Sequence, residues 1–173
     1  MKLFSLKSKL VAATAATAIL SSGMAVAQES ESGKIMMGFN PFGSSSVFGT
    51  PSVTAPSYMI GYKASETLLP FGYLSITDPG GSADTIFTVG GGARMYLGDM
   101  SNRIRPFAGG ALGIVNAADT GFGIGAFFGA EAMITDGVSI SGQIGAEIAD
   151  GGCNACDTTI DLGTANVMFN LYF

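Results

Sequence analysis

The C-terminal stretch 160–173, IDLGTANVMFNLYF, decides the fold because apolar and polar residues alternate along it at every second position. Successive side chains of a β-strand point to opposite faces, so the alternation predicts a strand with one apolar and one polar face. This strand is either a half-buried edge strand of a soluble sheet or the last strand of a transmembrane barrel whose apolar face meets lipid. The apolar face holds Ala165, Val167, Phe169, Leu171 and Phe173, and the opposite face holds Thr164, Asn166, Met168, Asn170 and Tyr172.

The N-terminus has the three parts of a Sec-type signal peptide. Three lysines precede an apolar segment at 10–20, and the small residues 25–27 (AVA) follow at the spacing that signal peptidase requires. The apolar segment is too short to remain in a bilayer as a helix. We therefore predict that residues 1–27 are cleaved and that residues 28–173 form one exported domain.

Composition excludes several classes of protein. Five basic and thirteen acidic residues follow residue 27, which gives a net charge of −8 and argues against nucleic acid as a partner. Although 47% of the chain is hydrophobic, no apolar run beyond the signal reaches the roughly 20 residues of a membrane helix. The 26 glycines also disfavour helices, since each internal glycine costs about 1 kcal/mol relative to alanine. We therefore expect an all-β chain.

Eight segments with two-residue alternation lie between turn signals. Long connections rich in Gly, Ser and Asp alternate with short ones, of which Asp136-Gly137 is a tight hairpin turn. Such segments pair with their neighbours, so the chain predicts an eight-stranded antiparallel up-and-down barrel with both termini on the periplasmic side. The facing of the third and fifth segments stays open, because aromatic residues or glycines compete for both faces. The segments are 33–40, 56–64, 70–78, 84–97, 105–116, 122–134, 138–149 and 160–173.

Charge content favours a transmembrane barrel over a soluble one. Only 12% of the chain is charged, whereas a soluble surface typically carries about 25–35% Lys, Arg, Asp and Glu. In hydrocarbon every backbone polar group needs a partner, so the sheet must close, and a Lys or Arg facing lipid near the midplane costs about 2–4 kcal/mol. A soluble ligand-binding barrel with its apolar face inside is the third interpretation. The charged residues predicted to face the lumen are Lys63, Arg94, Glu131 and Glu147.

These features resemble the small OmpA/OmpX-like outer-membrane β-barrel proteins of Gram-negative bacteria. The resemblance rests on the strand 89–97 (VGGGARMYL), on 105–110 (RPFAGG), on 129–131 (GAE) before the tight hairpin, and on the terminal Phe173. It implies an integral protein of the cell outer membrane, exported through the periplasm, with a structural or surface-interaction role and no enzymatic activity. The C-terminal signal by which such barrels are recognised for assembly corresponds to Phe169, Leu171 and Phe173.

The partners that we expect follow from this architecture. The barrel would contact outer-membrane lipid and lipopolysaccharide, meet the barrel-assembly machinery during biogenesis, and remain a monomer. Its long loops could meet a surface partner. The acidic residues at the loop bases are solvated loop charges or, alternatively, a divalent-cation bridge to lipopolysaccharide phosphates. They are Asp78, Asp84, Asp119, Asp150, Asp157 and Asp161.

The absence of histidine removes most catalytic and metal chemistry. Histidine-based triads, zinc sites and the His-Ser pair of lipid-modifying barrels all lack their usual residue. Glu131 and Glu147 could form a carboxylate pair, but the predicted register places them at different depths on adjacent strands. We therefore predict no catalytic residue, no metal and no cofactor.

A polar network in the lumen is the remaining candidate site. An eight-stranded barrel is just wide enough for side chains to fill. Either the charges satisfy one another in a packed lumen, where an unpaired charge is strongly destabilising, or Arg94 and Glu131 form a gate that re-pairs and admits small ions. The first interpretation is favoured, and a narrow gated ion channel is the alternative function. The predicted members of the network are Lys63, Arg94, Glu131, Glu147, Asn170 and Tyr172.

Cys153 and Cys156 lie in the last long connection. An exported chain meets an oxidising compartment, so we predict a disulfide between them. A redox role would need the start of a helix beside a strand-helix-strand unit, and a metal site would need two further soft ligands. The sequence around the pair provides neither.

Overall fold

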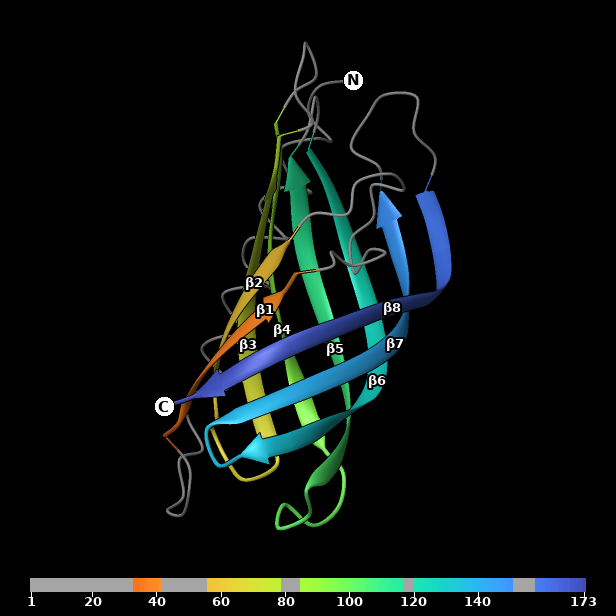
Figure 1. Cartoon of the computed structure of the whole chain (residues 1–173). Coiled ribbons are helices and arrows are strands. Elements are labelled where there is room, and N and C mark those ends of the chain that lie inside the picture. Colours follow the sequence, from red (N-terminus) through yellow and green to blue (C-terminus); the bar gives the residue numbers. More distant parts are fainter. Residues whose placement is uncertain (1–32, 42–55, 79–84, 117–119, 151–157) are drawn as a thin grey trace, which may run out of the picture.

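The chain forms a closed barrel of eight antiparallel strands, in which each strand pairs with the next and the last pairs with the first (Figure 1). The structure is a computed structural model that describes residues 33–41, 56–78, 85–116, 120–150 and 158–173. This topology confirms the predicted up-and-down barrel. The strands are β1 Ile35–Asn40, β2 Ser57–Tyr62, β3 Leu68–Thr77, β4 Ile86–Tyr96, β5 Ile104–Asn116, β6 Thr120–Thr135, β7 Val138–Asp150 and β8 Thr158–Tyr172.

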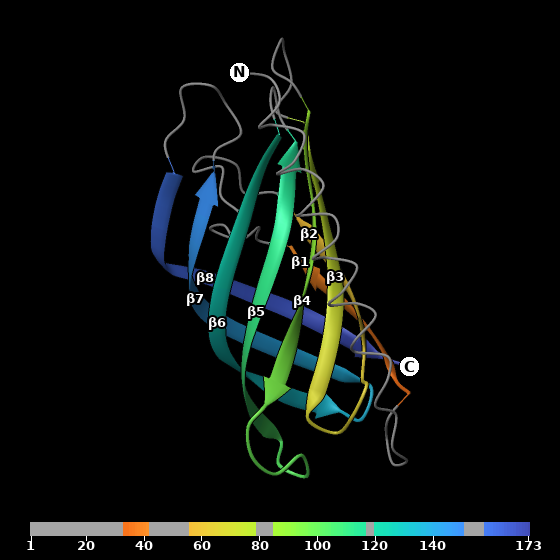
Figure 2. The same cartoon turned by 180° about the vertical axis from the view of Figure 1, so that it is seen from behind.

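The short connections gather at one end of the barrel (Figures 1 and 2). We call the first end the turn mouth; it is formed by the connections 63–67, 97–103 and 136–137. We call the other end the loop end. Strand β1 begins and β8 ends at the turn mouth, as an even number of strands requires. The predicted signal peptide, 1–27, lies outside the described residues, within which no helix is long and apolar enough to cross a membrane.

Apolar side chains cover the outside of the barrel. Ile144 on β7 and Phe169 on β8 are 48% and 41% exposed, whereas a soluble ligand-binding barrel would bury them. The side chains that alternate with them along the same strands, Ser141 and Asn170 among them, are buried in the lumen. This arrangement is the one expected for strands that face lipid outside and a polar lumen inside. The transmembrane orientation predicted from strand alternation is therefore confirmed.

The structure settles the two strands whose facing the sequence leaves open. On β3, Phe71 and Tyr73 point into the lumen and Ile76 points outward. On β5, Phe107 is buried in the lumen while Ile104 is exposed on the outside. Apolar residues on both faces of these strands hide the period-two signal, because the lumen itself contains a hydrophobic core.

A cluster of large apolar side chains fills the middle of the lumen. Its rings contact one another: the centroid of Phe127 lies 6.2 Å from that of Phe71 and 6.3 Å from that of Phe107. The thioethers of Met36 and Met168 belong to the same buried cluster. The barrel is thus a packed core lined by strands, as expected for eight strands.

Glycines make room for these rings. A Cβ atom added to Gly90 or to Gly113 would lie 2.1 Å from the hydroxyl oxygen of Tyr73. That hydroxyl donates a hydrogen bond to the carbonyl oxygen of Leu112, at 3.3 Å. The glycines of β4 and β5 therefore form a notch that lets Tyr73 lie across the inner wall.

The barrel closes through a short seam. Four residue pairs join β1 to β8, from Met36↔Tyr172 to Phe39↔Phe169, and we call this set the closing seam. By contrast, β7 and β8 pair along almost their whole length, with an irregularity between Gly145 and Ala146. The seam lies near the turn mouth, so closure of the sheet depends on the last residues of the chain.

Candidate functional site

Arg94 lies at the centre of the lumen, fully buried on the inward face of β4. Its Nη2 donates hydrogen bonds of 3.3 Å to Oε1 of Gln143 and to Sδ of Met168. The guanidinium carbon lies 4.7 Å from the ring centroid of Phe107 and 5.8 Å from that of Phe71. Arg94 is therefore held mainly by aromatic faces and by neutral acceptors.

Glu131 occupies a second layer of the lumen, closer to the turn mouth. Its carboxylate accepts hydrogen bonds from the hydroxyls of Tyr96 and Tyr172, each at 2.6 Å, and from Nδ2 of Asn170 at 3.1 Å. The hydroxyl of Ser139 donates to the same carboxylate. All four donors are neutral. A buried carboxylate with this many donors is satisfied without a direct cation.

The structure brings together only part of the predicted network. Glu131, Asn170 and Tyr172 are directly connected, whereas no ion pair between Arg94 and Glu131 exists among the contacts of the described residues. Arg94 and Glu131, which the sequence places in one lumen network, therefore belong to separate hydrogen-bonded groups, and the gate between them stays an alternative prediction. Alternation along a strand tells which face a residue takes, but not which layer of the lumen it reaches.

The remaining predicted members lie in different places. Lys63 is buried at the turn mouth, and Glu147 is buried on β7 towards the loop end. Sequence reasoning did not single out Tyr96, Ser139 and Gln143, which contribute to the two layers. Strand alternation could have identified them as lumen residues, because each alternates along its strand with an outward apolar residue.

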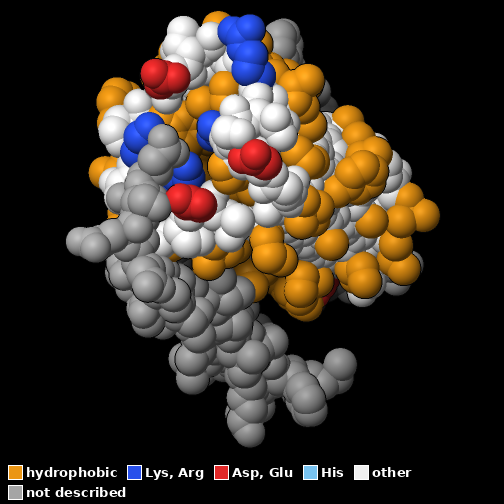
Figure 3. Space-filling model, turned by 90° about the horizontal axis from the view of Figure 1, so that it is seen from below, with side chains coloured by type: hydrophobic (Ala, Val, Ile, Leu, Met, Phe, Trp, Pro, Cys, Tyr) orange, Lys and Arg blue, Asp and Glu red, His pale blue; other side chains and the backbone are white. Residues whose placement is uncertain are grey.

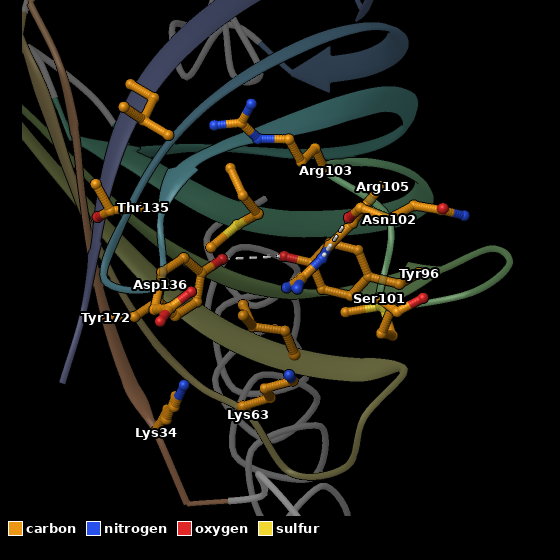
Figure 4. Close-up of a pocket in the computed structure, with 14 residues that line it drawn as sticks. Lys34, Lys63, Tyr96, Ser101, Asn102, Arg103, Arg105, Thr135, Asp136 and Tyr172 are labelled. Atoms are coloured by element: carbon orange, nitrogen blue, oxygen red, sulfur yellow. Dashed lines mark hydrogen bonds between the residues drawn. The ribbon is translucent and has the colours of Figure 1, made fainter.

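A cavity of about 380 Å³ opens at the turn mouth (Figure 4). The hydroxyls of Tyr96 and Tyr172 lie 3.2 Å apart at its inner side, next to the Glu131 layer. Seen from this end, Lys and Arg side chains gather around the mouth together with a few acidic ones (Figure 3). The basic residues that line the cavity are Lys34, Lys63, Arg103 and Arg105.

The residues of the predicted assembly signal lie on the closing seam. Phe169 and Leu171 pair with Phe39 and Met37 of β1 and point outward. The backbone of Phe173 exchanges two hydrogen bonds with that of Ile35, of 3.0 and 3.1 Å. Recognition of these residues during assembly stays a prediction.

Other predicted sites fall outside the described residues. These include Cys153 and Cys156, so their disulfide stays a prediction, as does any surface contact of the loops. Within the described ranges, no group of three or more His, Cys, Asp and Glu side chains could hold a metal ion. The described lumen therefore offers a packed polar network and a cation-lined cavity as its two candidate sites.

Comparison with known proteins identifies a fold. No family model and no curated protein matches the chain. The crystal structure of Neisserial surface protein A (NspA) matches with a TM-score of 0.54 and 14% identity over 81% of this chain and 96% of that one. The solution structure of outer membrane protein W of E. coli matches with a TM-score of 0.49 and 13% identity over 84% and 100%. The likeness to NspA shows that the chain has the fold of a small eight-stranded outer-membrane barrel.

Proposed function

We propose that this protein is an integral outer-membrane barrel with a structural or surface-interaction role and without catalytic activity. The observation that carries the proposal is the filled lumen, where the rings of Phe71 and Phe107 lie against the buried Arg94 and the ring of Phe127 packs against both. A solute moving along the axis would have to displace these side chains. The two ends of the barrel are then the surfaces available for interaction.

Two independent features support a location in the outer membrane. The apolar exterior suits a hydrocarbon environment, and the predicted signal peptide provides export to the periplasm. On this basis lipid and lipopolysaccharide contact the exterior, and the barrel-assembly machinery inserts the chain. We infer a monomer, since lipid alone covers the apolar exterior.

The loop end is the surface for which we propose an external partner. Asp78, Asp150 and Asp161 are exposed there, and the sequence contains no Lys or Arg after Arg105. Carboxylate oxygens are preferred ligands of hard divalent cations, so bridging to lipopolysaccharide phosphates is one role for this acidic rim. A surface partner that meets this end would need a basic or cation-bridged face.

A narrow gated ion channel is the competing function. The gate would require Arg94 and Glu131 to pair and separate, whereas Arg94 donates to Gln143 and Glu131 accepts from neutral donors. No contact in the described lumen favours conduction. Structural packing therefore remains the better account of the lumen charges.

Planar-bilayer recordings test the closed lumen. We expect purified wild-type protein to be silent and the double variant Phe107→Ala/Phe127→Ala to give conductance steps, because two rings leave the centre of the lumen. The matched control is Phe122→Ala/Phe128→Ala, which removes two rings from the lipid face and should stay silent. Wild-type steps as large as those of the lumen variant would contradict the proposal.

Fractionation tests the membrane location separately. The protein should remain in the outer-membrane fraction after carbonate washing and migrate faster on gels before heating than after it. Release by the wash, with mobility unchanged by heat, would show that the barrel is not integral.

A further inference from the structure

The outer face of the closing seam does not define how β1 and β8 are aligned. A slip of one residue would turn the side chains of one strand to the wrong face, but a slip of two residues keeps apolar residues outside and lumen residues inside. Phe39 lies opposite Phe169 in the closed barrel. After a slip of two residues it would lie opposite Val167 or Leu171, which are also apolar and exposed on the outside. The apolar contacts of the seam are therefore nearly the same in either register.

Backbone pairing does not define the alignment either. Strand β8 is 15 residues long and β1 is six residues long, so β1 could move by two residues towards the start of β8 and still find a partner for each of its residues. A move in the other direction would carry Ile35 and Met36 past the end of the chain. The competing register is thus the one shifted towards the start of β8, and it would place Met36 opposite Asn170.

On its lumen side, the seam has one position on β1 without a side chain. The inward residues of β1 are Met36, Gly38 and Asn40, and the side chains of the first and third are fully buried. Gly38 lies directly opposite Asn170. A Cβ atom added to Gly38 would lie 3.1 Å from Oδ1 of Asn170 and 3.0 Å from Cε of Met168, closer than such atoms normally approach. Side chains of β8 therefore already fill the space above Gly38.

The Asn170 amide is held in this position by two other strands. Its Nδ2 donates hydrogen bonds to Oε1 of Glu131 on β6, at 3.1 Å, and to the hydroxyl oxygens of Ser139 and Ser141 on β7, at 3.0 and 3.2 Å. A carboxylate only accepts hydrogen bonds, so Glu131 selects the NH₂ group of the amide. Oδ1 is thereby left on the side of Gly38.

The competing register would bring a side chain into this filled space. After the slip, Cβ of Met36 would take the position that a Cβ at Gly38 would have now, close to Oδ1 of Asn170, with the rest of the methionine side chain beyond it. The amide could move away only by giving up its bonds to Glu131, Ser139 and Ser141. The lumen side of the seam therefore distinguishes the two registers where the outer face does not.

We propose that Asn170 and Gly38 form a lock that sets the register in which the barrel closes. Asn170 is a fixed projection from β8, and Gly38 is the inward position of β1 that leaves room for it. A buried polar side chain that selects one register among several is a known device in other folds. In a barrel the register also sets the stagger of the strands, which is linked to its diameter. The lock rests on the barrel fold alone and is independent of the role of either end.

Thiol crosslinking of the refolded mature chain reads the register directly. Cys153 and Cys156 are replaced by serine, and the barrel is refolded from urea in detergent micelles. The first reporter carries Met37→Cys and Leu171→Cys, at positions that lie opposite each other in the closed barrel. The second reporter carries Met37→Cys and Phe169→Cys, at positions that would lie opposite each other only after the slip. Folded molecules are selected by heat-modifiable gel mobility, treated with a short thiol crosslinker, and the linked chains are counted on denaturing gels.

We expect the barrel with an intact lock to link the first reporter efficiently and the second only as diagonal neighbours do. Gly38→Leu fills the space opposite Asn170 and should lower the ratio of the first link to the second about tenfold, because overpacking disfavours the native register. Asn170→Gly removes the projection and should also lower this ratio. Gly142→Leu, the matched control, adds the same side chain at an exposed position of β7 where a Cβ meets nothing within 4 Å, and should leave the ratio unchanged.

The Asn170→Gly variant decides the test if Gly38→Leu does not fold, since it adds no bulk. An unchanged ratio in folded Asn170→Gly would overturn the lock, and so would an equal change in Gly142→Leu. A lower urea midpoint of Asn170→Gly with the first link alone would show that the pair contributes packing and not register, which also overturns the proposal.

Discussion

The hydroxyl groups of Tyr96 on β4 and Tyr172 on β8 lie 3.2 Å apart, and each donates a 2.6 Å hydrogen bond to a different oxygen of the Glu131 carboxylate. The three residues come from alternate strands of the sheet. Hydrogen bonds of the sheet join only neighbouring strands, so this cluster ties the wall together across the lumen. Its loss should affect the barrel as a whole.

Glu131→Gln should destabilise the barrel by about 1.5–3 kcal/mol, because a buried charged acceptor with four donors becomes an amide whose NH₂ group faces donors. Urea unfolding in detergent micelles, followed by far-UV circular dichroism, gives the change in unfolding free energy. Glu66→Gln, at an exposed turn position, is the control and should cost less than about 1 kcal/mol. Equal effects of the two variants would show that the carboxylate contributes little.

Gly113→Ala should destabilise by about 1–3 kcal/mol, because the new methyl group would overlap the Tyr73 hydroxyl. Adding Tyr73→Phe removes the nearest atom and should recover part of the loss. Gly142→Ala is the matched control, since a Cβ there meets nothing within 4 Å. The same urea experiment measures all three variants. If the Gly113→Ala barrel is as stable as the Gly142→Ala barrel, the Tyr73 side chain does not depend on the space that Gly113 leaves.

Arg94→Met should change the unfolding free energy by less than about 1 kcal/mol, because Nε and Nη1 of Arg94 have no hydrogen-bond partner among the described residues and an apolar side chain suits the aromatic cluster. Gln143→Leu should cost about 1–3 kcal/mol, since it removes an acceptor from a buried cation. The double variant should regain most of that loss. If the losses of unfolding free energy in the two single variants add up in the double variant, Arg94 and Gln143 are not energetically coupled.

Deletion of Phe173 should impair assembly in cells far more than it impairs the stability of the refolded barrel. The deletion removes two backbone hydrogen bonds to Ile35, worth about 1 kcal/mol each, and leaves the four pairs of the closing seam in place. The amount of protein in the outer membrane reports assembly, and the urea midpoint of the refolded barrel reports stability; both are measured for the wild type and the deletion. Phe128→Ala, which removes an outward ring from β6, is the control. Unchanged membrane levels after the deletion would show that Phe173 carries no assembly signal.

Alternation along the chain predicts the facing of most residues on six strands, because a period of two assigns a side chain to lipid or lumen without knowledge of its neighbours. On β8 the phase changes at Gly163, where the register with β7 shifts, so Leu162 points outward although strict alternation from Ala165 would turn it inward. Alternation fails on β3 and β5. Phe71 and Phe107 are as apolar as the lipid-facing residues, and the space that Gly129 leaves for the Phe107 ring appears only once the neighbouring strand is in place.

The site is predicted less well for a related reason. Asn170 and Tyr172 reach Glu131 as the sequence suggests, but Arg94 does not. Depth in the lumen depends on the stagger between strands, which is a property of the closed barrel and not of any single strand. The mouth cavity is also hidden from the sequence, since Lys34 and Arg105 come together only when the first and fifth strands take their places.

The closing seam also sets an order of events. Its two halves come from the first and last strands, so a growing or partly inserted sheet keeps two unpaired edges until residues 169–172 arrive. Open edges of this kind recruit other strands and lead to aggregation. A chain that lacks residues 169–172 would therefore keep the edges of β1 and β7 unpaired.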